Sequence, residues 1–328
     1  MKYRYIILAT ISFALPASTI IYSSTYVDVL NLSEVKNHSI VIDGNKITTS
    51  KLKSILFSDL KTVVHCHRNN EIIRMLWYRF LGAKFKLIAT RHAETVPSGL
   101  TKYLLKKADK VITLIKSMST NLGIDNTLIA HGVRVEEFVP NPEKRLEKIK
   151  QDNVILNAGR VRKAKGQLVL LEAAKVLKEQ KNWALVIVGK VDKPLFLEEL
   201  KTITKKHEIE NQVYFVDETR DIISYYQAAK IVVAPSFSEG FSLVTAEAMS
   251  CECTVIATKN VGVHSQLITN GKIGYLFEAG NSPALELLLF KLMKNQISHL
   301  GKQGREEIAQ NWSAKKEAQN LIELYKLW

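Results

Sequence analysis

The sequence predicts an α/β protein of two Rossmann-like, doubly wound domains that face a central cleft. Its 328 residues are more than one hydrophobic core usually supports, so we expect two domains. Short β-branched runs alternate with stretches rich in helix formers, which is typical of parallel sheets covered by helices. The hydrophobic content of 46% is that of a folded chain and excludes a disordered one.

The domain boundary is predicted from two prolines and a charged segment. Pro140 and Pro142 precede a charged run at 143–152, and a new apolar run begins at Val154. An amphipathic helix is expected at the C-terminus, where apolar residues recur on one helical face. The predicted units are a first domain at 1–141, a second domain at 142–312 and a terminal helix at 313–328.

The N-terminus begins with basic Lys2 and Arg4, and an apolar run follows at 5–11. This pattern fits either a secretory signal peptide or the first strand of the first domain. We favour the strand, because cleavage would remove an element that a doubly wound domain needs. Polar residues interrupt the run, so it is too weak for a membrane span.

A glycine-flanked basic loop follows the predicted strand at Val154. It carries Arg160 and Lys165 beside Gly159 and Gly166. A guanidinium fork binds pairs of oxygens, and glycines let backbone N–H groups approach a ligand, so this loop suits a diphosphate. An ordinary solvated basic loop is the alternative.

A second loop, in the segment S-E-G-F-S-L-V-T-A-E-A-M at 238–249, follows the apolar run at 231–234. The pattern predicts strand, turn and helix, with Glu239 in the turn. The backbone N–H groups at the start of such a helix suit a phosphate. Glu247 lies more than one turn into the helix, where a carboxylate accepts hydrogen bonds from sugar hydroxyls. A solvated surface pair of carboxylates is the alternative.

Together these two segments resemble the donor half of the family-four retaining glycosyltransferases, which have the GT-B fold. The matching motifs occur in the family's order: G-R-x-x-x-x-K-G at 159–166, E-G-F-S at 239–242 and E-A-M at 247–249. The resemblance covers residues 154–277 well and the N-terminal half more loosely. It implies a nucleotide-sugar donor, and a terminal helix that crosses back onto the first domain.

The resemblance also implies a role for each matching residue. Arg160 and Lys165 hold the donor pyrophosphate, and Glu247 holds the ribose. Glu239, with the backbone after Gly240, meets the transferred sugar. The implied donor-binding residues are Gly159, Arg160, Lys165, Glu239, Gly240, Phe241, Ser242, Leu243 and Glu247.

In the first domain, a predicted strand ends at Thr90 and His92 follows it. Open α/β sheets bind ligands at the carboxyl ends of their strands, although a lone histidine is more often structural. The motif T-R-H-A-x-x-x-P-S-G at 90–99, with His131-Gly132-Val133, resembles a narrower group, the mannosyltransferases of the lipopolysaccharide core. This resemblance implies that His92 is directed at the transferred sugar.

The sequence departs from the family pattern at two places. Arg134 replaces the aspartate that many relatives have after the Gly-Val pair. The usual glycine-rich loop after the first strand is missing, and Ala14–Ser18 stands in its place. The resemblance links this loop to binding of the acceptor, so the second departure affects the acceptor site.

Positive charge is concentrated in the first half of the chain. Residues 1–150 carry 23 Lys and Arg against 12 Asp and Glu, a net of +11 of the total +14. Between Lys61 and Lys116, basic residues alternate with aromatic ones, which predicts contact with an anionic membrane surface or a phosphorylated glycolipid. Solvated helix faces account for part of this charge. The sequence has no recognised nucleic-acid-binding motif, so we expect no nucleic-acid partner.

Three cysteines, Cys66, Cys251 and Cys253, are too few for a disulfide framework and favour a reducing compartment. Neither His65-Cys66-His67 nor Cys251-Glu252-Cys253 has the spacing of a zinc site. The sequence also lacks an Asp-x-Asp pair that would hold a cation on a diphosphate. We therefore expect no metal and no cofactor.

The combined interpretation is a metal-independent, retaining hexosyltransferase, peripheral at the cytoplasmic face of the inner membrane. The resemblance implies transfer of mannose from GDP-mannose to a lipopolysaccharide core or related glycolipid acceptor. The catalytic residues implied are His92, Glu239, Arg160 and Lys165. A sugar-nucleotide epimerase of similar fold and a non-catalytic sugar-nucleotide-binding protein are the alternatives.

Overall fold

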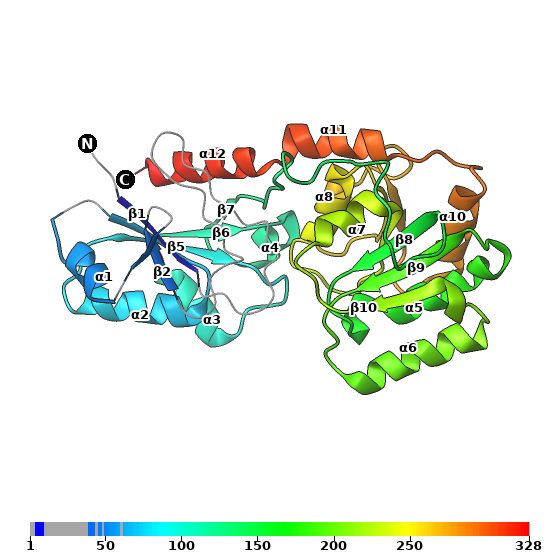
Figure 1. Cartoon of the computed structure of the whole chain (residues 1–328). Helices are drawn as coiled ribbons and strands as arrows, with labels where there is room; N and C mark the ends of the chain where they lie inside the picture. Colours follow the sequence, from blue (N-terminus) through cyan, green and yellow to red (C-terminus); the bar gives the residue numbers. More distant parts are fainter. Residues whose placement is uncertain (1–3, 10–38, 43–44, 48, 60–61, 328) are drawn as a thin grey trace. The chain divides into compact units, whose positions relative to one another are not determined.

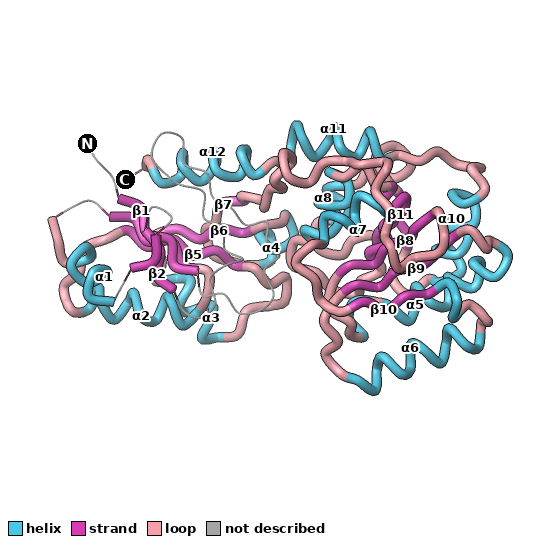
Figure 2. The backbone as a smooth tube through the Cα atoms, viewed as in Figure 1, coloured by secondary structure: helices cyan, strands magenta, loops and turns pink. Residues whose placement is uncertain are grey.

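The computed structural model describes residues 4–9, 39–42, 45–47, 49–59 and 62–327. The chain forms two compact units (Figures 1 and 2). The first comprises Met1–Arg134 with Trp312–Trp328, and the second comprises Val135–Asn311. Each unit is a largely parallel sheet with helices on both faces, which confirms the predicted fold class. The segment Ala14–Ser18, discussed above as a substitute for a glycine-rich loop, lies outside the described residues.

In the described part of the first unit, seven strands form one sheet in the order β3-β2-β1-β4-β5-β6-β7. The strand predicted at the N-terminus is β1, which pairs in parallel with β4 and antiparallel with β2. Strands β4 to β7 are parallel, so their carboxyl ends share one edge. The strands are β1 (Arg4–Ala9), β2 (Ser39–Ile42), β3 (Asn45–Ile47), β4 (Thr62–Cys66), β5 (Lys86–Arg91), β6 (Lys110–Thr113) and β7 (Thr127–Leu128).

Three helices cover one face of this sheet, and the C-terminal helix covers the other. Buried residues of α1 (Thr49–Leu56), α2 (Asn69–Phe80) and α3 (Gly99–Lys106) form one core with the strands. On the opposite face, Leu321 and Leu324 of α12 (Ala314–Tyr325) pack against buried strand residues. A short helix, α4 (Lys116–Asn121), follows β6.

The sheet of the second unit is fully parallel, in the order β10-β9-β8-β11-β12-β13. Strands β8 and β9 are buried at every position, as expected for a parallel sheet covered on both faces. The strands are β8 (Asn153–Ala158), β9 (Trp183–Val188), β10 (Val213–Val216), β11 (Ala229–Ala234), β12 (Thr254–Thr258) and β13 (Tyr275–Phe277).

Helices α5 and α10 pack together on one face of this sheet with α6 beside them, while α8 and α11 pack together on the other (Figure 1). The helix predicted after Gly166 continues beyond Ala173 as a 3₁₀ helix, η3 (Ala174–Glu179). The helices are α5 (Gln167–Ala173), α6 (Pro194–Lys206), α7 (Ile222–Ala228), α8 (Leu243–Ser250), α9 (His264–Leu267), α10 (Ser282–Met293) and α11 (Gly301–Asn311). Short 3₁₀ turns lie at η2 (Lys163–Lys165) and η4 (Glu210–Gln212).

The strand order places the two predicted loops together. The chain leaves β8 toward β9 and β10 on one side, then returns to β11 and continues to β12 on the other. The loops after β8 and β11 therefore flank the point where the strand order reverses, which is where open α/β sheets bind ligands. None of the helices in the described part of the chain is long and apolar enough to span a bilayer.

Candidate functional site

The loop after β8 touches the loop after β11. The backbone N–H of Phe237 donates to the carbonyl of Ala164 over 2.9 Å. Gly166 has a left-handed backbone with φ of +71°, and a Cβ there would lie 2.0 Å from the carbonyl oxygen of Pro235. Because only glycine fits this conformation and this distance, Gly166 allows the two loops to meet.

Lys165 and Glu239 form an ion pair where these loops meet. Lys165 Nζ lies 2.6 Å from Oε1 and 2.7 Å from Oε2 of Glu239. Ser236 Oγ donates to Glu239 Oε1 over 2.6 Å. The two charged side chains are only 18% and 10% exposed. Such a short, charge-assisted contact holds the ammonium group in place.

The pairing bears on the alternative interpretation of this loop, an ordinary solvated basic segment. Lys165 is largely buried, because the parallel sheet brings Glu239 beside it. Arg160 is about one-third exposed, and its Nη1 lies 3.7 Å from Asp192 Oδ1. In this structure the two cations therefore contact different carboxylates.

The turn before α8 is held in an uncommon conformation. Ser242 is the N-cap residue and has φ of +74°, which costs a non-glycine residue about 1–3 kcal/mol. Its hydroxyl contacts Thr245 Oγ1 at 2.9 Å and His264 Nε2 at 2.9 Å. Gly240, Phe241 and Leu243 complete this turn and the first position of the helix. The contacts of Ser242 hold the turn from which α8 begins.

His264 is a residue of this site that the sequence analysis missed. Its Nδ1 lies 3.0 Å from the carbonyl oxygen of Thr258, so Nδ1–H donates and Nε2 accepts from Ser242 Oγ. The ring is fully buried, and burial lowers its pKa, so it is neutral at pH 7. The only local signal is one histidine after V-G-V at 261–263, which by itself indicates no function.

Glu247 lies in α8, and its side chain is almost completely buried. Tyr226 of α7 donates its hydroxyl to Glu247 Oε2 over 3.0 Å. Burial, with the nearby Glu247 carboxylate, raises the pKa of Tyr226 well above its usual value. The tyrosine therefore stays protonated and remains a donor to the carboxylate.

His92 lies in the first unit, directly after β5, and is half-buried. Its Nε2 is 2.9 Å from His67 Nδ1, and its Nδ1 is 3.4 Å from His131 Nε2. His67 follows β4, so both rings stand at the carboxyl edge of the sheet. Among the described residues, no three His, Cys, Asp or Glu side chains are arranged to hold a metal ion. The three cysteines are free and buried.

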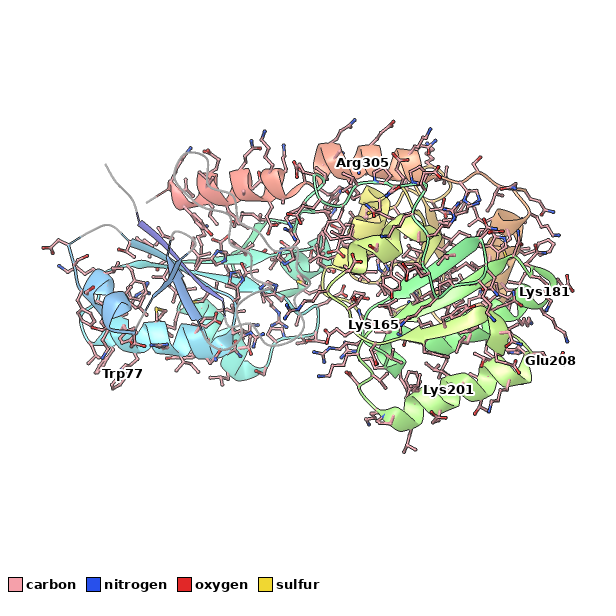
Figure 3. All side chains as sticks on the ribbon, in the orientation of Figure 1. Trp77, Lys165, Lys181, Lys201, Glu208 and Arg305 are labelled. Atoms are coloured by element: carbon pink, nitrogen blue, oxygen red, sulfur yellow. The ribbon has the colours of Figure 1, made fainter. Side chains whose placement is uncertain are left out.

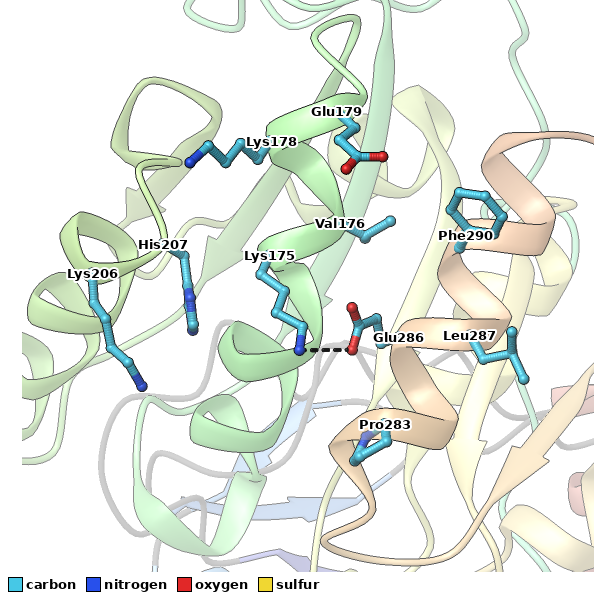
Figure 4. Close-up of a pocket in the computed structure, with 10 residues that line it drawn as sticks. All are labelled: Lys175, Val176, Lys178, Glu179, Lys206, His207, Pro283, Glu286, Leu287 and Phe290. Carbon is cyan, nitrogen blue, oxygen red and sulfur yellow. Dashed lines mark ion pairs between the residues drawn. The ribbon is translucent and has the colours of Figure 1, made fainter.

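A pocket of about 650 Å³ lies elsewhere in the second unit, between η3, the end of α6 and α10 (Figure 4). None of the predicted site residues lines it. Its lysines are matched by carboxylates: Lys175 lies 3.1 Å from Glu286, and Lys206 lies 3.4 Å from Glu172. The pocket therefore lies apart from the loops that follow β8 and β11.

Comparison with known proteins finds glycosyltransferases, both by family model and among individual relatives. A family model described as "Glycosyl transferases group 1" matches residues 140–318. The lipopolysaccharide core biosynthesis mannosyltransferase LpsB of Rhizobium meliloti (strain 1021) is 26% identical over 93% of each chain. The lipopolysaccharide core biosynthesis mannosyltransferase LpcC of Rhizobium leguminosarum bv. viciae is 27% identical over 81% of this chain and 78% of its own.

Solved structures share the fold of this chain as well. The crystal structure of Anabaena Alr3699/HepE in complex with UDP superposes with a TM-score of 0.75 and 18% sequence identity. The match covers 85% of this chain and 82% of that one. At this identity the likeness concerns the fold.

Proposed function

The chain belongs to the group 1 glycosyl transferases, and from this premise we propose that it transfers mannose from GDP-mannose to a lipopolysaccharide core acceptor. The family and the fold make it a hexosyltransferase of the GT-B class, as the sequence predicted. The choice of mannose and of the acceptor is supported by the relatives, which are named as lipopolysaccharide core mannosyltransferases. The family match favours transfer over the epimerase and the non-catalytic alternatives.

The observation that carries the proposal is the Lys165–Glu239 pair at the reversal of strand order. An ammonium group held beside glycines and the N-terminus of α8 favours a diphosphate. The cation and the helix N-terminus stabilise negative charge, and the glycines let backbone N–H groups approach it. Lys165 and Arg160 would bind the leaving diphosphate, each contributing about 3 kcal/mol to the transition state. Glu239 would then contact the transferred sugar, and Glu247 the ribose.

Retention of configuration at the anomeric carbon needs no protein nucleophile in this proposal. The acceptor hydroxyl oxygen forms a bond to the anomeric carbon while the bond from that carbon to the diphosphate oxygen breaks. The hydroxyl proton passes to the departing diphosphate on the same face of the sugar. The protein contributes by positioning the reactants and by stabilising the charge that develops on the diphosphate. His92 is proposed to bind the transferred sugar.

The donor is tested by thermal unfolding in the presence of GDP-, UDP- and ADP-sugars. A ligand that binds only the folded protein at a hundredfold excess over Kd stabilises it by about 2.7 kcal/mol. We expect GDP-mannose to raise the unfolding temperature by several degrees, and the same screen on Lys165→Ala to show a much smaller rise. A larger rise in unfolding temperature with a UDP-sugar would contradict guanine as the base of the donor.

We further propose that transfer requires no metal ion, because Lys165 and Arg160 neutralise the diphosphate and the sequence has no Asp-x-Asp pair. Transfer measured in excess chelator is expected to stay within about twofold of the untreated rate. Abolition by chelator, followed by recovery on adding manganese or magnesium, would refute this mechanism.

We also propose that the first unit docks on an anionic membrane, at the cytoplasmic face of the inner membrane, where a glycolipid acceptor would be reached. Helix α2 buries one side, but Ile73, Trp77 and Phe80 form an exposed apolar stripe at spacings of four and three residues. Trp77 is 58% exposed and Phe80 79% exposed, and the two rings stack. Trp77 projects away from the sheet (Figure 3).

Basic residues stand beside this stripe. Helix α3 packs next to α2 and carries exposed Lys102, Tyr103 and Lys106, and exposed Lys107 follows as its C-cap residue. An apolar stripe next to lysines is the composition of helices that lie in a membrane interface. The fourth lysine of the predicted basic cluster, Lys110, lies in β6 and pairs with Asp125 at 2.9 Å.

Vesicle binding tests this docking face. Trp77→Ala combined with Phe80→Ala is expected to weaken binding to anionic vesicles at least about tenfold, since each buried side chain contributes about 1.5–3 kcal/mol. Replacing Lys102, Lys106 and Lys107 should weaken it by up to about 1 kcal/mol per charge and reduce its salt dependence. Leu195→Ala serves as control, because Leu195 is 86% exposed in the second unit. Equal binding by the aromatic variant and the control would contradict the assignment.

A further inference from the structure

The first unit contains a row of histidine rings that begins at a buried carboxylate. Glu317 of α12 lies 2.9 Å from His131 Nδ1, and His131 Nε2 lies 3.4 Å from His92 Nδ1. His92 Nε2 in turn lies 2.9 Å from His67 Nδ1. Adjacent rings stack or tilt onto one another with centroids 5.1–5.4 Å apart. Four side chains from separate segments thus form one hydrogen-bonded chain.

When His131 is the neutral imidazole, the carboxylate sets the direction of every hydrogen bond in this chain. A carboxylate can only accept, so neutral His131 carries its proton on Nδ1 and has a lone pair on Nε2. His92 must then donate from Nδ1 to His131, which makes Nε2 of His92 an acceptor for His67 Nδ1–H. The second oxygen of Glu317 accepts from the backbone N–H of Gly132 over 2.8 Å, which holds the carboxylate in place.

The surroundings keep the middle of the chain uncharged. Burial, with the nearby His131, lowers the pKa of His92 to about 3, and burial likewise lowers the pKa of His67. The charged groups near this end are Arg68, which lowers both pKa values, and Glu71. Glu71 Oε2 accepts from the backbone N–H groups of His67 and Arg68. At neutral pH the two rings are therefore neutral, and each has one donor and one acceptor nitrogen.

We infer that Glu317 and the neutral form of His131 are positioning residues that hold His92 in the Nδ1–H form, so that His92 Nε2 is a hydrogen-bond acceptor. A sugar hydroxyl can replace His67 at this nitrogen, whereas the opposite tautomer would present a donor there. The C-terminal helix therefore sets the hydrogen-bonding character of a residue at the carboxyl edge of the first sheet. This inference rests on the proposed function only for the role of His92 in sugar binding.

The tautomers are measured directly by long-range ¹H–¹⁵N NMR correlation on protein labelled with ¹⁵N-histidine. In the parent protein we expect the Nδ1–H form at His131 and His92. In Glu317→Gln the side-chain amide keeps one oxygen for Gly132 N–H and turns its NH₂ group toward His131. His131 and His92 should then both change to the Nε2–H form.

Glu323→Gln is the matched control, because Glu323 lies in the same helix with a side chain 73% exposed and pairs with Lys326 at the surface. It should leave the tautomers and the turnover unchanged. Glu317→Gln should lower kcat/KM about tenfold relative to this control. An Nε2–H form at His92 in the parent protein would overturn the inference even if Glu317→Gln failed to fold. A loss of activity in Glu317→Gln with unchanged tautomers would make Glu317 merely structural and would also overturn it.

Discussion

Replacing Lys165 with alanine is expected to lower turnover at least about a hundredfold. The variant loses an ammonium group that is held at the reversal of strand order, and a charge-assisted donor to a developing anion contributes about 3 kcal/mol to the transition state. The substitution also leaves the largely buried Glu239 without the cation that Glu239 contacts here, which the loss of an exposed lysine would not do. We therefore expect a loss of stability of about 1–3 kcal/mol.

Two variants separate these effects. Lys163→Ala lies in the same 3₁₀ turn, with a side chain 75% exposed, and should change neither turnover nor stability. Arg160→Ala should lower turnover about as much as Lys165→Ala without measurable destabilisation, because Arg160 is more exposed and lies 3.7 Å from its carboxylate partner. Turnover by Lys165→Ala within tenfold of the parent protein, in a folded sample, would exclude the proposed role.

Gly166→Ala is expected to have the largest effect on stability among the site variants. Its new Cβ would meet the carbonyl of Pro235 at 2.0 Å, which forces the loops after β8 and β11 apart. Left-handed strain of about 1–2 kcal/mol and overpacking of about 1–3 kcal/mol together predict a loss of about 2–5 kcal/mol. Donor binding should weaken as well, because Lys165 and Glu239 would no longer meet.

Gly271→Ala isolates the contribution of strain alone. Gly271 has φ of +72°, and nothing lies within 4 Å of its potential Cβ. It should cost only the strain of about 1–2 kcal/mol and leave donor binding unchanged. Urea denaturation of both variants measures the difference, and equal losses would show that contact between the loops contributes little.

Much of the second unit could be predicted from the sequence because its signals are local. The run before Pro235 is β11, and Gly159 and Gly166 flank a loop directly after β8, as the pattern indicated. A β-branched run followed by a glycine-containing turn and helix formers specifies strand, loop and helix within about twenty residues. The resemblance to family motifs with fixed spacing then predicts the chemistry of that loop.

The contacts within the site could not be predicted in the same way. Lys165 and Glu239 are 74 residues apart, and they meet only because β8 and β11 are neighbours in the sheet. His264 carries no local motif, although it holds Ser242. These pairings depend on strand order, which a single sequence does not encode in any short pattern.

The first unit shows the same division between local and non-local information. The apolar stripe of Ile73, Trp77 and Phe80 follows helical spacing and could have been recognised within α2. The histidine chain could not, because Glu317 and His131 are 186 residues apart and approach each other only when α12 packs on the sheet. A lone histidine in the sequence thus turned out to be one member of a connected row.

We propose that this chain moves a hexose from a nucleotide-diphosphate sugar to a glycolipid through the site at Lys165 and Glu239. The most direct test incubates the folded protein with GDP-mannose labelled in the sugar and a lipopolysaccharide core acceptor that lacks the terminal mannose. We predict that the label leaves the nucleotide and appears in the acceptor with retained configuration. Label that stays in the soluble nucleotide sugar, or that is released only as free sugar at saturating acceptor, would contradict transfer to the glycolipid.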